Sequence, residues 1–561
     1  MKNIRTQVLK KVIFFLLMMC TFDSVGQYFP STNDTLNYSS VLFQFPWVEG
    51  AQQYEVLIQN ETKKTGDIVQ IIEANKTVIN SLEFGCDYSW KVRGLTSLGE
   101  KLTWSSVQKF SVGWSDLIDI EKNRYLGKKM SRDLATRGLL FFDYGRVGVN
   151  RAGVPSWYFP EMDSLTSETI IRDLKMTGLG TFTALVGNSA IEFDRDGNKI
   201  WEAPNDGQVN GEVQENYHHE FTKLPSGNYL VLGLDHVMRK VPNGLDSVLV
   251  EFGTVIEYSP KGEVVWSWNS NDYFIDADLF SRTRANGFDV RTHMNAASTD
   301  GEHVFVGFRD ISRIVVIDKK KRKVVESYGG YGVFQEPHAA TGFFRRQHAA
   351  VQLEDGNMAV FNNDSIMDPK VVSSVVIFSR IKDGAEESMK LFDFAMDFDT
   401  LTEGKSAKTG NLLELENGNL LVNMGDLNRA IELTRDGEVV WSMFMEKYDT
   451  LRNTWRAFPQ YRVSHANTLY PYEFTAKVES NTYSRRKRSI VIRVFNIGDK
   501  PDMYSISLEK KNKSMDVGEI TILPGFYEDF RVQLKGKSEL TAVVKSINSS
   551  RNEEVIVYGF H

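Results

Sequence analysis

Short apolar runs separated by turn residues fill most of the chain, and one such pattern recurs. It opens with a histidine, continues as a short run, turns at a Ser-Gly or Asp-Gly pair and closes with a second apolar run. Three copies carry the histidine, and they cover residues 219–232, 293–306 and 348–361. A further copy without a histidine covers residues 413–422. Two apolar runs around a tight turn predict a β-hairpin.

A second pattern lies between copies of the first and ends in a tryptophan. It covers residues 190–201, 255–268 and 430–442, and a degenerate copy begins at residue 314. Each full copy places an Asp-Gly or Lys-Gly turn between two apolar runs, so it also predicts a hairpin. Alternation of the two hairpins gives four strands per repeat, and four-stranded repeats around an axis are typical of a β-propeller. We therefore predict an all-β chain in which residues 114–475 form a six-bladed β-propeller.

The repeat is flanked on both sides by segments with a different pattern. Residues 28–113 predict a small β-sandwich, in which residues 88–93 alternate at period two as a half-buried strand does. The order of its strands, with Tyr-Ser-Trp and Trp-Ser patterns, resembles fibronectin type III modules. Residues 476–561 lose the repeat but keep alternating runs, and we predict a second module there that is also like a β-sandwich.

The first 26 residues have the pattern of an export signal. Basic residues precede a short apolar run at residues 12–19, and Ser24-Val25-Gly26 offers small residues for cleavage before Gln27. The run is too short to span a bilayer, and no long apolar run follows, so we expect no stable membrane span. We expect a periplasmic or secreted protein from which residues 1–26 are removed. A lipid anchor on Cys20 is the less favoured alternative, because the two residues before it are bulky.

The net charge and the number of cysteines limit which partners and which disulfides are expected. The chain has 66 basic and 73 acidic residues and a net charge of −7, so we expect no binding to nucleic acid. Cys20 and Cys86 are the two cysteines of the sequence. Removal of the signal leaves Cys86 alone, so no disulfide forms within the chain. We expect Cys86 to be a small buried side chain.

The predicted propeller implies a common location for the repeated histidines. In such a fold the first strand of each blade lines the central channel. Histidines at the start of these strands therefore converge on one axis. We expect one member of the doublet His218 and His219 to lie close to His293 and His348 there.

Two polar residues and one further histidine accompany this group. Asn295 comes two residues after His293, so it is expected on the same face of its strand. Arg309 follows the next apolar run and is expected to return towards the axis. His465 is a weaker candidate, because no hairpin pattern follows it.

Several imidazoles with a guanidinium and an amide suit a particular chemistry. A glycosidase needs two carboxylates and a serine hydrolase needs a nucleophile elbow, and neither pattern stands out. The histidines lack the short spacing of common metal ligands, so we expect no metal and no cofactor. One imidazole can be a nucleophile, another an acid and base, while arginine and amide groups hold anionic oxygens. The set predicts sulfuryl or phosphoryl transfer; metal binding and simple packing of the histidines stay open.

Three motifs resemble those of bacterial arylsulfate sulfotransferases, over roughly residues 130–445. They are His218-His219-Glu220 with Leu224-Pro225-Ser226-Gly227-Asn228, Thr292-His293-Met294-Asn295 with Gly307-Phe308-Arg309, and Arg346-Gln347-His348-Ala349 with Asp355-Gly356-Asn357. The resemblance implies an exported six-bladed propeller with an N-terminal β-sandwich. It also implies a ping-pong reaction, in which a transiently sulfated histidine carries the sulfuryl group from an aryl sulfate donor to a phenolic acceptor. No nucleotide sulfate donor is involved in that family.

The resemblance implies a role for each matching residue. His348 matches the nucleophile, and the doublet His218 and His219 matches a further catalytic histidine, with His219 favoured as the one that faces the channel. The other matches are His293 and Asn295, which form the substrate-binding His-x-Asn pair, and Arg309, which binds the sulfate oxygens. His293 and Arg309 are expected to take part in catalysis as well.

Two features depart from the family pattern. Members from enteric bacteria carry a pair of cysteines near the site, which this chain lacks, and the module after residue 476 is not part of the usual pattern. The main alternative function is a non-catalytic exported propeller that binds a ligand or a glycan. A third hypothesis for the function is a metal-dependent hydrolase or lyase. A homodimer is left open.

Overall fold

The structure is a computed structural model that describes residues 28–559 with gaps. The gaps are residues 81, 132–133, 163–168, 241–246, 276–278, 280–289, 331–339, 341, 365–370, 382–386, 511–512 and 550. The predicted export signal and Cys20 lie outside the described residues. Within the described ranges, strands form nearly all of the regular structure, beside short 3₁₀-helices at Asp116–Ile118 (η1), Ser270–Asp272 (η2) and Gly425–Leu427 (η3). The predicted all-β class is therefore confirmed. In the same ranges, no helix has the length and apolar character that crossing a membrane requires.

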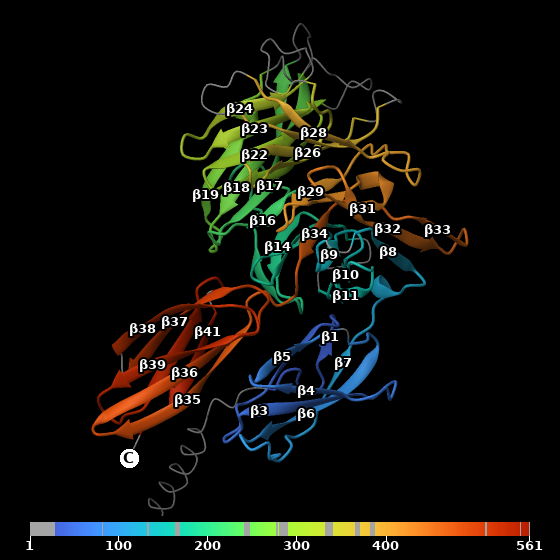
Figure 1. The fold of residues 1–561 in the computed structure, drawn as a ribbon. Helices are drawn as coiled ribbons and strands as arrows, with labels where there is room; N and C mark the ends of the chain where they lie inside the picture. The colour runs from blue at the N-terminus through green and yellow to red at the C-terminus, as the bar shows by residue number, and fades with distance from the viewer. Residues whose placement is uncertain are drawn as a thin grey trace, which may run out of the picture. The chain divides into compact units, whose positions relative to one another are not determined.

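The chain divides into two compact units, which Figure 1 shows as ribbons. One unit joins Met1–Gly113 with Tyr472–His561, and the other is Trp114–Pro471. The two flanking segments therefore belong to one unit, although the whole second unit separates them in sequence.

Residues 28–113 form two sheets of the first unit. One has the order β1-β7-β6-β3-β4 and the other pairs β2 with β5. The strands are β1 (Thr35–Leu36), β2 (Val41–Gln44), β3 (Gln53–Asn60), β4 (Ile68–Ile72), β5 (Lys76–Ile79), β6 (Cys86–Leu95) and β7 (Gln108–Val112). Trp90 of β6 packs edge to face on Phe43 of β2, with ring centroids 5.1 Å apart, so the two sheets share a core. Cys86 is buried, as predicted.

The C-terminal segment adds two further sheets to this unit. Their orders are β35-β36-β39 and β38-β37-β40-β41. The strands are β35 (Phe474–Ser484), β36 (Lys487–Asn496), β37 (Asp502–Lys510), β38 (Lys513–Ile522), β39 (Tyr527–Leu534), β40 (Leu540–Ser546) and β41 (Asn552–Val557). Ile490 and Ile492 of one sheet pack with Ile506 and Val544 of the other. The alternating runs of the sequence thus build two sheets around one core.

The second unit contains six sheets among its described residues, which we number in order of the blade repeat. Sheet 1 has β34 (Val463–Ala466), β9 (Leu139–Phe142), β10 (Val147–Asn150) and β11 (Pro155–Tyr158). Sheet 2 has β12 (Ile171–Met176), β13 (Phe182–Val186), β14 (Ser189–Phe193) and β15 (Lys199–Glu202). Sheet 3 has β16 (Phe221–Lys223), β17 (Tyr229–Lys240), β18 (Ser247–Tyr258) and β19 (Val264–Asn269), with β20 (Val290–Arg291) beside β18.

The remaining three sheets follow the same plan. Sheet 4 has β21 (Met294–Thr299), β22 (His303–Phe308), β23 (Arg313–Asp318) and β24 (Lys323–Gly329). Sheet 5 has β25 (His348–Gln352), β26 (Met358–Asn362), β27 (Ser374–Phe378) and β28 (Lys390–Ala395). Sheet 6 has β29 (Asn411–Glu414), β30 (Leu420–Asn423), β31 (Arg429–Leu433), β32 (Val439–Asp449) and β33 (Thr454–Ala457), with β8 (Asn123–Lys129) beside β32.

Both repeated sequence patterns fold as hairpins. The pattern that opens with a histidine forms the antiparallel pairs β16–β17, β21–β22 and β25–β26, and its copy without a histidine forms β29–β30. The pattern that ends in a tryptophan forms β14–β15, β18–β19 and β31–β32, and the degenerate copy forms β23–β24. The predicted hairpins are therefore confirmed, and in sheets 3, 4 and 6 one copy of each pattern supplies the first four strands.

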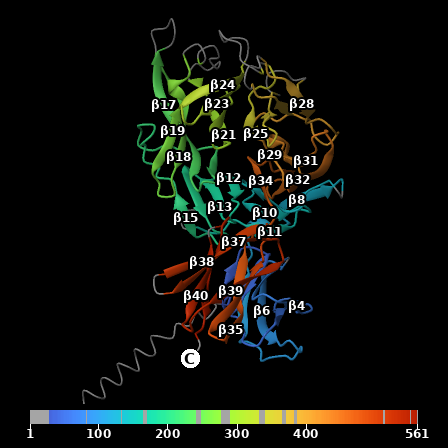
Figure 2. The same cartoon turned by 60° about the vertical axis from the view of Figure 1, so that its left-hand side comes forward.

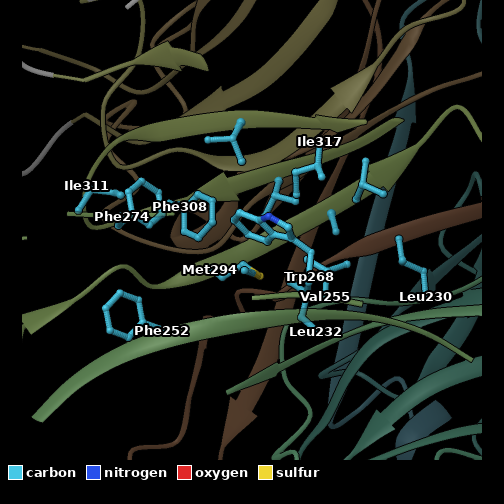
Figure 3. Close-up of a cluster of buried hydrophobic side chains, with 14 of the residues drawn as sticks. Leu230, Leu232, Phe252, Val255, Trp268, Phe274, Met294, Phe308, Ile311 and Ile317 are labelled. Atoms are coloured by element: carbon cyan, nitrogen blue, oxygen red, sulfur yellow. The ribbon is translucent and has the colours of Figure 1, made fainter. Parts of the chain in front are cut away.

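Hydrophobic cores fill the spaces between neighbouring sheets. Between sheets 3 and 4, Leu232 and Trp268 pack with Met294 and Phe308, as Figure 3 shows. The neighbouring residues Ala296 and Ala297 belong to different cores, Ala297 to this one and Ala296 to the core between sheets 4 and 5. Successive side chains of a strand point to opposite faces. Sheet 4 is therefore buried on both sides, and each fully buried large apolar side chain contributes about 1.5–3 kcal/mol.

Tryptophans in the fourth strands link one sheet to the next. Three of them donate the indole N–H to a backbone carbonyl of the following sheet: Trp157 of β11 to Arg195 at 3.2 Å, Trp266 of β19 to Lys319 at 2.9 Å and Trp441 of β32 to Arg151 at 2.8 Å. The last pair joins sheet 6 to sheet 1. Contacts of β13 with β16, β22 with β25 and β26 with β29 join the sheets in between, so the six sheets follow one another around a closed ring.

The first strands of the sheets meet at the centre of this ring. Contacts connect β21 with β25, β25 with β29, β29 with β34 and β34 with β12, and Figure 2 shows these strands in the middle of the unit. The last of them in sequence, β34, completes sheet 1, whose other strands come from the start of the unit. The fold of the second unit is thus propeller-like, with the inner strands around a common axis.

Candidate functional site

Four histidines lie at the start of three inner strands. His218 and His219 precede β16, His293 precedes β21, and His348 is the first residue of β25. The rings of His219 and His293 are 5.0 Å apart between centroids, and those of His218 and His219 are 4.7 Å apart. The charge of His348 lowers the pKa of His219, and the charge of His293 lowers the pKa of His348. The structure therefore brings these four predicted histidines together.

Hydrogen bonds define the protonation of the histidine doublet. Nε2 of His218 donates to the carbonyl oxygen of Gly233 at 3.2 Å, so Nδ1 of a neutral His218 can only accept. Nδ1 of His218 is hydrogen-bonded to Nδ1 of His219, which must therefore be the donor. A neutral His219 then keeps its lone pair on Nε2. His218 supports the ring of His219, while His219 contacts His293 and Tyr461.

The backbone of two of these histidines is in an uncommon conformation. His219 has a φ of 62° and His293 a φ of 52°, both in the left-handed region that few residues other than glycine adopt. Such conformations cost of order 1–3 kcal/mol each and cluster at functional sites. The strand β21 also has an irregular register between Met294 and Ala296. Simple alternation from His293 to Asn295, on which the sequence prediction of a shared face relied, does not apply across this irregularity.

His348 is held at both ring nitrogens. Its Nδ1 lies 2.7 Å from Oδ1 of Asn363, and the backbone N–H of Thr409 donates to its Nε2 at 3.3 Å. Asn363 directly follows β26, and its own amide group donates to the carbonyl oxygens of Ser406 at 3.1 Å and of Thr409 at 3.0 Å. The sequence pattern did not single out Asn363.

Guanidinium groups concentrate positive charge beside His293 and His348. Arg309 donates to the carboxylate of Asp310 at 2.8 Å and to the carbonyl oxygen of Ala407 at 3.5 Å. Arg346, two residues before His348, lies 3.4 Å from the same oxygen of Asp310. The charge of Arg309 lowers the pKa of both His293 and His348. The predicted arginine therefore lies within electrostatic reach of the two histidines.

Asn295 is fully buried beside the start of β25. Its amide group donates to the carbonyl oxygen of Gln347 at 2.9 Å, and Gln347 is the residue before His348. Its Oδ1 has no hydrogen-bond partner within the described part of the chain. One role of Asn295 is therefore to tie β21 to the backbone that carries His348.

Tyr461 and Arg462 belong to the same surroundings, and the sequence prediction missed them. The ring of Tyr461 lies 5.8 Å from that of His219 between centroids. Arg462 is ion-paired with Asp173 at 2.8 Å and with Glu220, and it donates to the carbonyl oxygen of Asn295 at 3.0 Å. Both residues precede the inner strand β34 as the histidines precede theirs. The hairpin partner of β34 is β9, which comes much earlier in the sequence, so no local pattern marks this segment.

His465 occupies a different place. It lies within β34, and its Nε2 donates to the carbonyl oxygen of Arg137 at 2.7 Å. Burial lowers its pKa, with a further contribution from the charge of Arg151. It lines a cavity of about 400 Å³ that runs along the inner strands of all six sheets, from β12, β16, β21, β25, β29 and β34. This weaker candidate therefore belongs to the channel and not to the group around His219.

Burial keeps the clustered histidines neutral. It lowers the pKa of His218 to about 3 and that of His293 to about 4. It also lowers the pKa of His219 and of His348 well below the usual value, with further contributions from neighbouring imidazoles and from Arg309 and Arg462. A neutral imidazole has a free lone pair and can act as a nucleophile or a base. Within the described ranges, no group of three or more histidine, cysteine, aspartate or glutamate side chains is arranged to hold a metal ion.

Comparison with known proteins finds one family model that matches part of this unit. The model of the Arylsulfotransferase (ASST) family matches residues 140–383, a segment that includes all four clustered histidines, Asn295 and Arg309. No curated protein matches the chain. Similar solved structures include a protein of unknown function from Bacteroides caccae, with 16% identity over 60% of this chain and 100% of that chain and a TM-score of 0.38. Another is the hydrazine synthase of Kuenenia stuttgartiensis, with 11% identity over 54% and 99% of the two chains and a TM-score of 0.29. The family match confirms the resemblance seen in the three histidine motifs: residues 140–383 of this chain are similar to the arylsulfotransferase (ASST) family.

Proposed function

We propose that the protein transfers a sulfuryl group from an aryl sulfate ester to a phenolic acceptor, in a ping-pong reaction through a sulfated His348. The observation that carries the proposal is the buried cluster of neutral imidazoles beside Arg309, within the segment that matches the sulfotransferase family. Neutral imidazole supplies a nucleophile without an activating metal or cofactor.

In the first half of the reaction, a ring nitrogen of His348 attacks the sulfur of the donor. The lone pair forms the N–S bond, the bond from sulfur to the aryl oxygen breaks, and its electron pair leaves with that oxygen. The anionic donor raises the pKa of the imidazoles beside it, so His293 or His219 can carry the proton that the aryl oxygen takes. The phenol then leaves, and the sulfuryl group stays on His348.

In the second half, the acceptor phenol replaces the first product. Nε2 of His219 keeps its lone pair in the hydrogen-bond pattern of the doublet, and it takes the proton of the acceptor hydroxyl. The phenolate oxygen attacks sulfur, and the N–S electron pair returns to His348. Arg309, with Asn295 as a further donor, balances the charge of the sulfuryl oxygens in both halves.

The finer fold assignments belong to this proposal. We infer that each of the six sheets is one blade, with the propeller at residues 114–475, a fibronectin type III-like sandwich at residues 28–113 and a C-terminal β-sandwich-like module at residues 476–561. The closed series of links from sheet to sheet supports the blade assignment. We also infer export to the periplasm or the exterior with removal of residues 1–26, and the basic and apolar pattern of that segment supports this.

The experiment is the release of nitrophenol from nitrophenyl sulfate, with and without an added phenol. A transferase through a histidine releases nitrophenol continuously only when the acceptor phenol is present. Continuous release without an acceptor would favour a hydrolase, and no release under either condition would favour a propeller that only binds its ligand.

A further inference from the structure

We propose that Asn363 is a positioning residue that holds His348 in the tautomer with a proton on Nδ1 and the lone pair on Nε2. The inference rests on the proposed function, in which His348 is the nucleophile. Asn363 is fully buried, and its Oδ1 lies 2.7 Å from Nδ1 of His348. A nucleophilic imidazole needs its lone pair on the nitrogen that faces the substrate, so the residue that selects the tautomer selects the reactive atom.

The orientation of the Asn363 amide follows from its other partners. Its nitrogen donates to the carbonyl oxygens of Ser406 and Thr409, at 3.1 Å and 3.0 Å. A flipped amide would turn Oδ1 towards these two oxygens, and no hydrogen bond can form between oxygens that only accept. Oδ1 must therefore face His348. Because a carbonyl oxygen accepts and never donates, Nδ1 of His348 must carry the proton.

A second contact requires the same tautomer. The backbone N–H of Thr409 donates to Nε2 of His348 at 3.3 Å, and this bond needs a nitrogen without a proton. The bond is long and therefore weak. An incoming sulfur atom can replace it at Nε2. When the N–S bond forms there, the proton stays on Nδ1, and Oδ1 of Asn363 faces the positive charge that develops on the ring.

Asn423 offers a matched control in the next sheet. It ends β30, and its amide nitrogen donates to the carbonyl oxygens of Gln460 at 3.0 Å and of Tyr461 at 3.2 Å, in the loop before β34. Asn363 does the same for the loop before β29. Within the described residues, however, Oδ1 of Asn423 has no partner. A pair of variants therefore separates support of a loop from positioning of an imidazole.

The charged groups around His348 fix what a change at Asn363 does to its protonation. Burial lowers the pKa of His348 most, the hydrogen bond with Asn363 raises this pKa, and the charges of Arg309, His293 and Arg462 lower it further. Asn363→Asp would place a carboxylate beside Nδ1 and favour the protonated ring. Protonation removes the nucleophile, so the acidic limb of activity moves to higher pH. Asn363→Leu removes the acceptor and leaves only the weak bond from Thr409 to select the tautomer.

The test compares kcat/KM for nitrophenyl sulfate across pH, with a fixed phenol acceptor, in the full-length protein and three variants. We expect kcat/KM to fall about 10- to 100-fold in Asn363→Leu, which is the loss found when the partner that orients a metal-bound imidazole is removed. We expect Asn423→Leu to lose less and to keep the pH profile. Asn363→Asp should shift the acidic limb upward. An unchanged limb in Asn363→Asp, with equal losses in the two leucine variants, would overturn the proposal.

A measurement on the unaltered protein keeps the proposal testable if the variants fold poorly. In ¹⁵N-histidine spectra, with His348 assigned by its absence in His348→Gln, we expect a protonated Nδ1 and a bare Nε2. The reverse pattern would overturn the inference. A protein that transfers sulfuryl groups but shows the reverse pattern refutes only the role of Asn363, whereas a protein that transfers none refutes the proposed function.

Discussion

The rings of His219 and His293 lie 5.0 Å apart between centroids and are nearly perpendicular, at 79°. They come from the entrances of two different sheets, and both have a left-handed backbone. Two strained residues from separate sheets that meet in this way are typical of a site that the surrounding fold holds in place. Substitutions in this site are therefore expected to change the turnover of the protein and its pH dependence.

The first prediction concerns the residue that carries the sulfuryl group. Incubation with an aryl sulfate and no acceptor should add one sulfuryl group to the protein, because the second half of the reaction cannot proceed. His348→Asn should abolish this adduct, since the side-chain amide is a poor nucleophile. Intact-protein mass spectrometry measures the adduct, and peptide mapping places it. His219→Ala should slow its formation without moving it, and an adduct that persists in His348→Asn would refute the assignment.

The second prediction concerns Arg309. Arg309→Ala should lower turnover by about 100- to 1000-fold, the usual cost of a lost donor to charge that develops in the transition state. Arg309→Lys should also lose activity, because an ammonium group cannot form the planar two-pronged contact of a guanidinium. Steady-state kinetics with nitrophenyl sulfate give both values. Near-normal turnover in Arg309→Ala would mean that the sulfate is bound elsewhere.

Much of the fold could be predicted because its repeats are local. A hairpin such as β25–β26 is encoded by adjacent apolar runs and an Asp-Gly turn, and it folds where the pattern places it. The role of the tryptophans that close the hairpins could not be predicted from the sequence. The indole N–H of Trp441 donates a hydrogen bond to the carbonyl oxygen of Arg151 in the next sheet, so this residue stabilises the contact between two sheets.

Long-range partners of the site could not be predicted. Asn363 reaches His348 from the end of a neighbouring strand, and Arg462 reaches Asp173 only because β34 closes the ring. Neither residue stands in a repeated motif. The backbone conformation of His219 also depends on tertiary packing, because no residue type signals a left-handed histidine.

The third prediction is the pH dependence of the first half-reaction. Burial and nearby positive charge hold the pKa of His348 well below its usual value, and burial lowers that of His293 to about 4. The nucleophile must be neutral, and a lowered pKa means that it is protonated only at lower pH. The acidic limb of kcat/KM for the donor, which reports the free enzyme, should therefore lie well below pH 6.5, the usual pKa of histidine. A limb near that ordinary value would contradict the burial of the site.

The fourth prediction concerns the buried ion pairs of Arg462. Arg462 is ion-paired with Asp173 and Glu220, and these carboxylates are almost inaccessible to solvent. Their charges hold the pKa of Arg462 well above its usual value. Arg462→Met would leave Lys175 as their cation and should lower the free energy of unfolding by about 3–5 kcal/mol, since an uncompensated buried charge is costly. Urea unfolding followed by tryptophan fluorescence measures the change.

Arg452→Ala is the control, because the Arg452 side chain is 65% exposed and its ion pair with Asp449 should contribute little to the free energy of unfolding. Equal shifts of the unfolding midpoint in the two variants would show that the Arg462 network does not stabilise the centre of the unit.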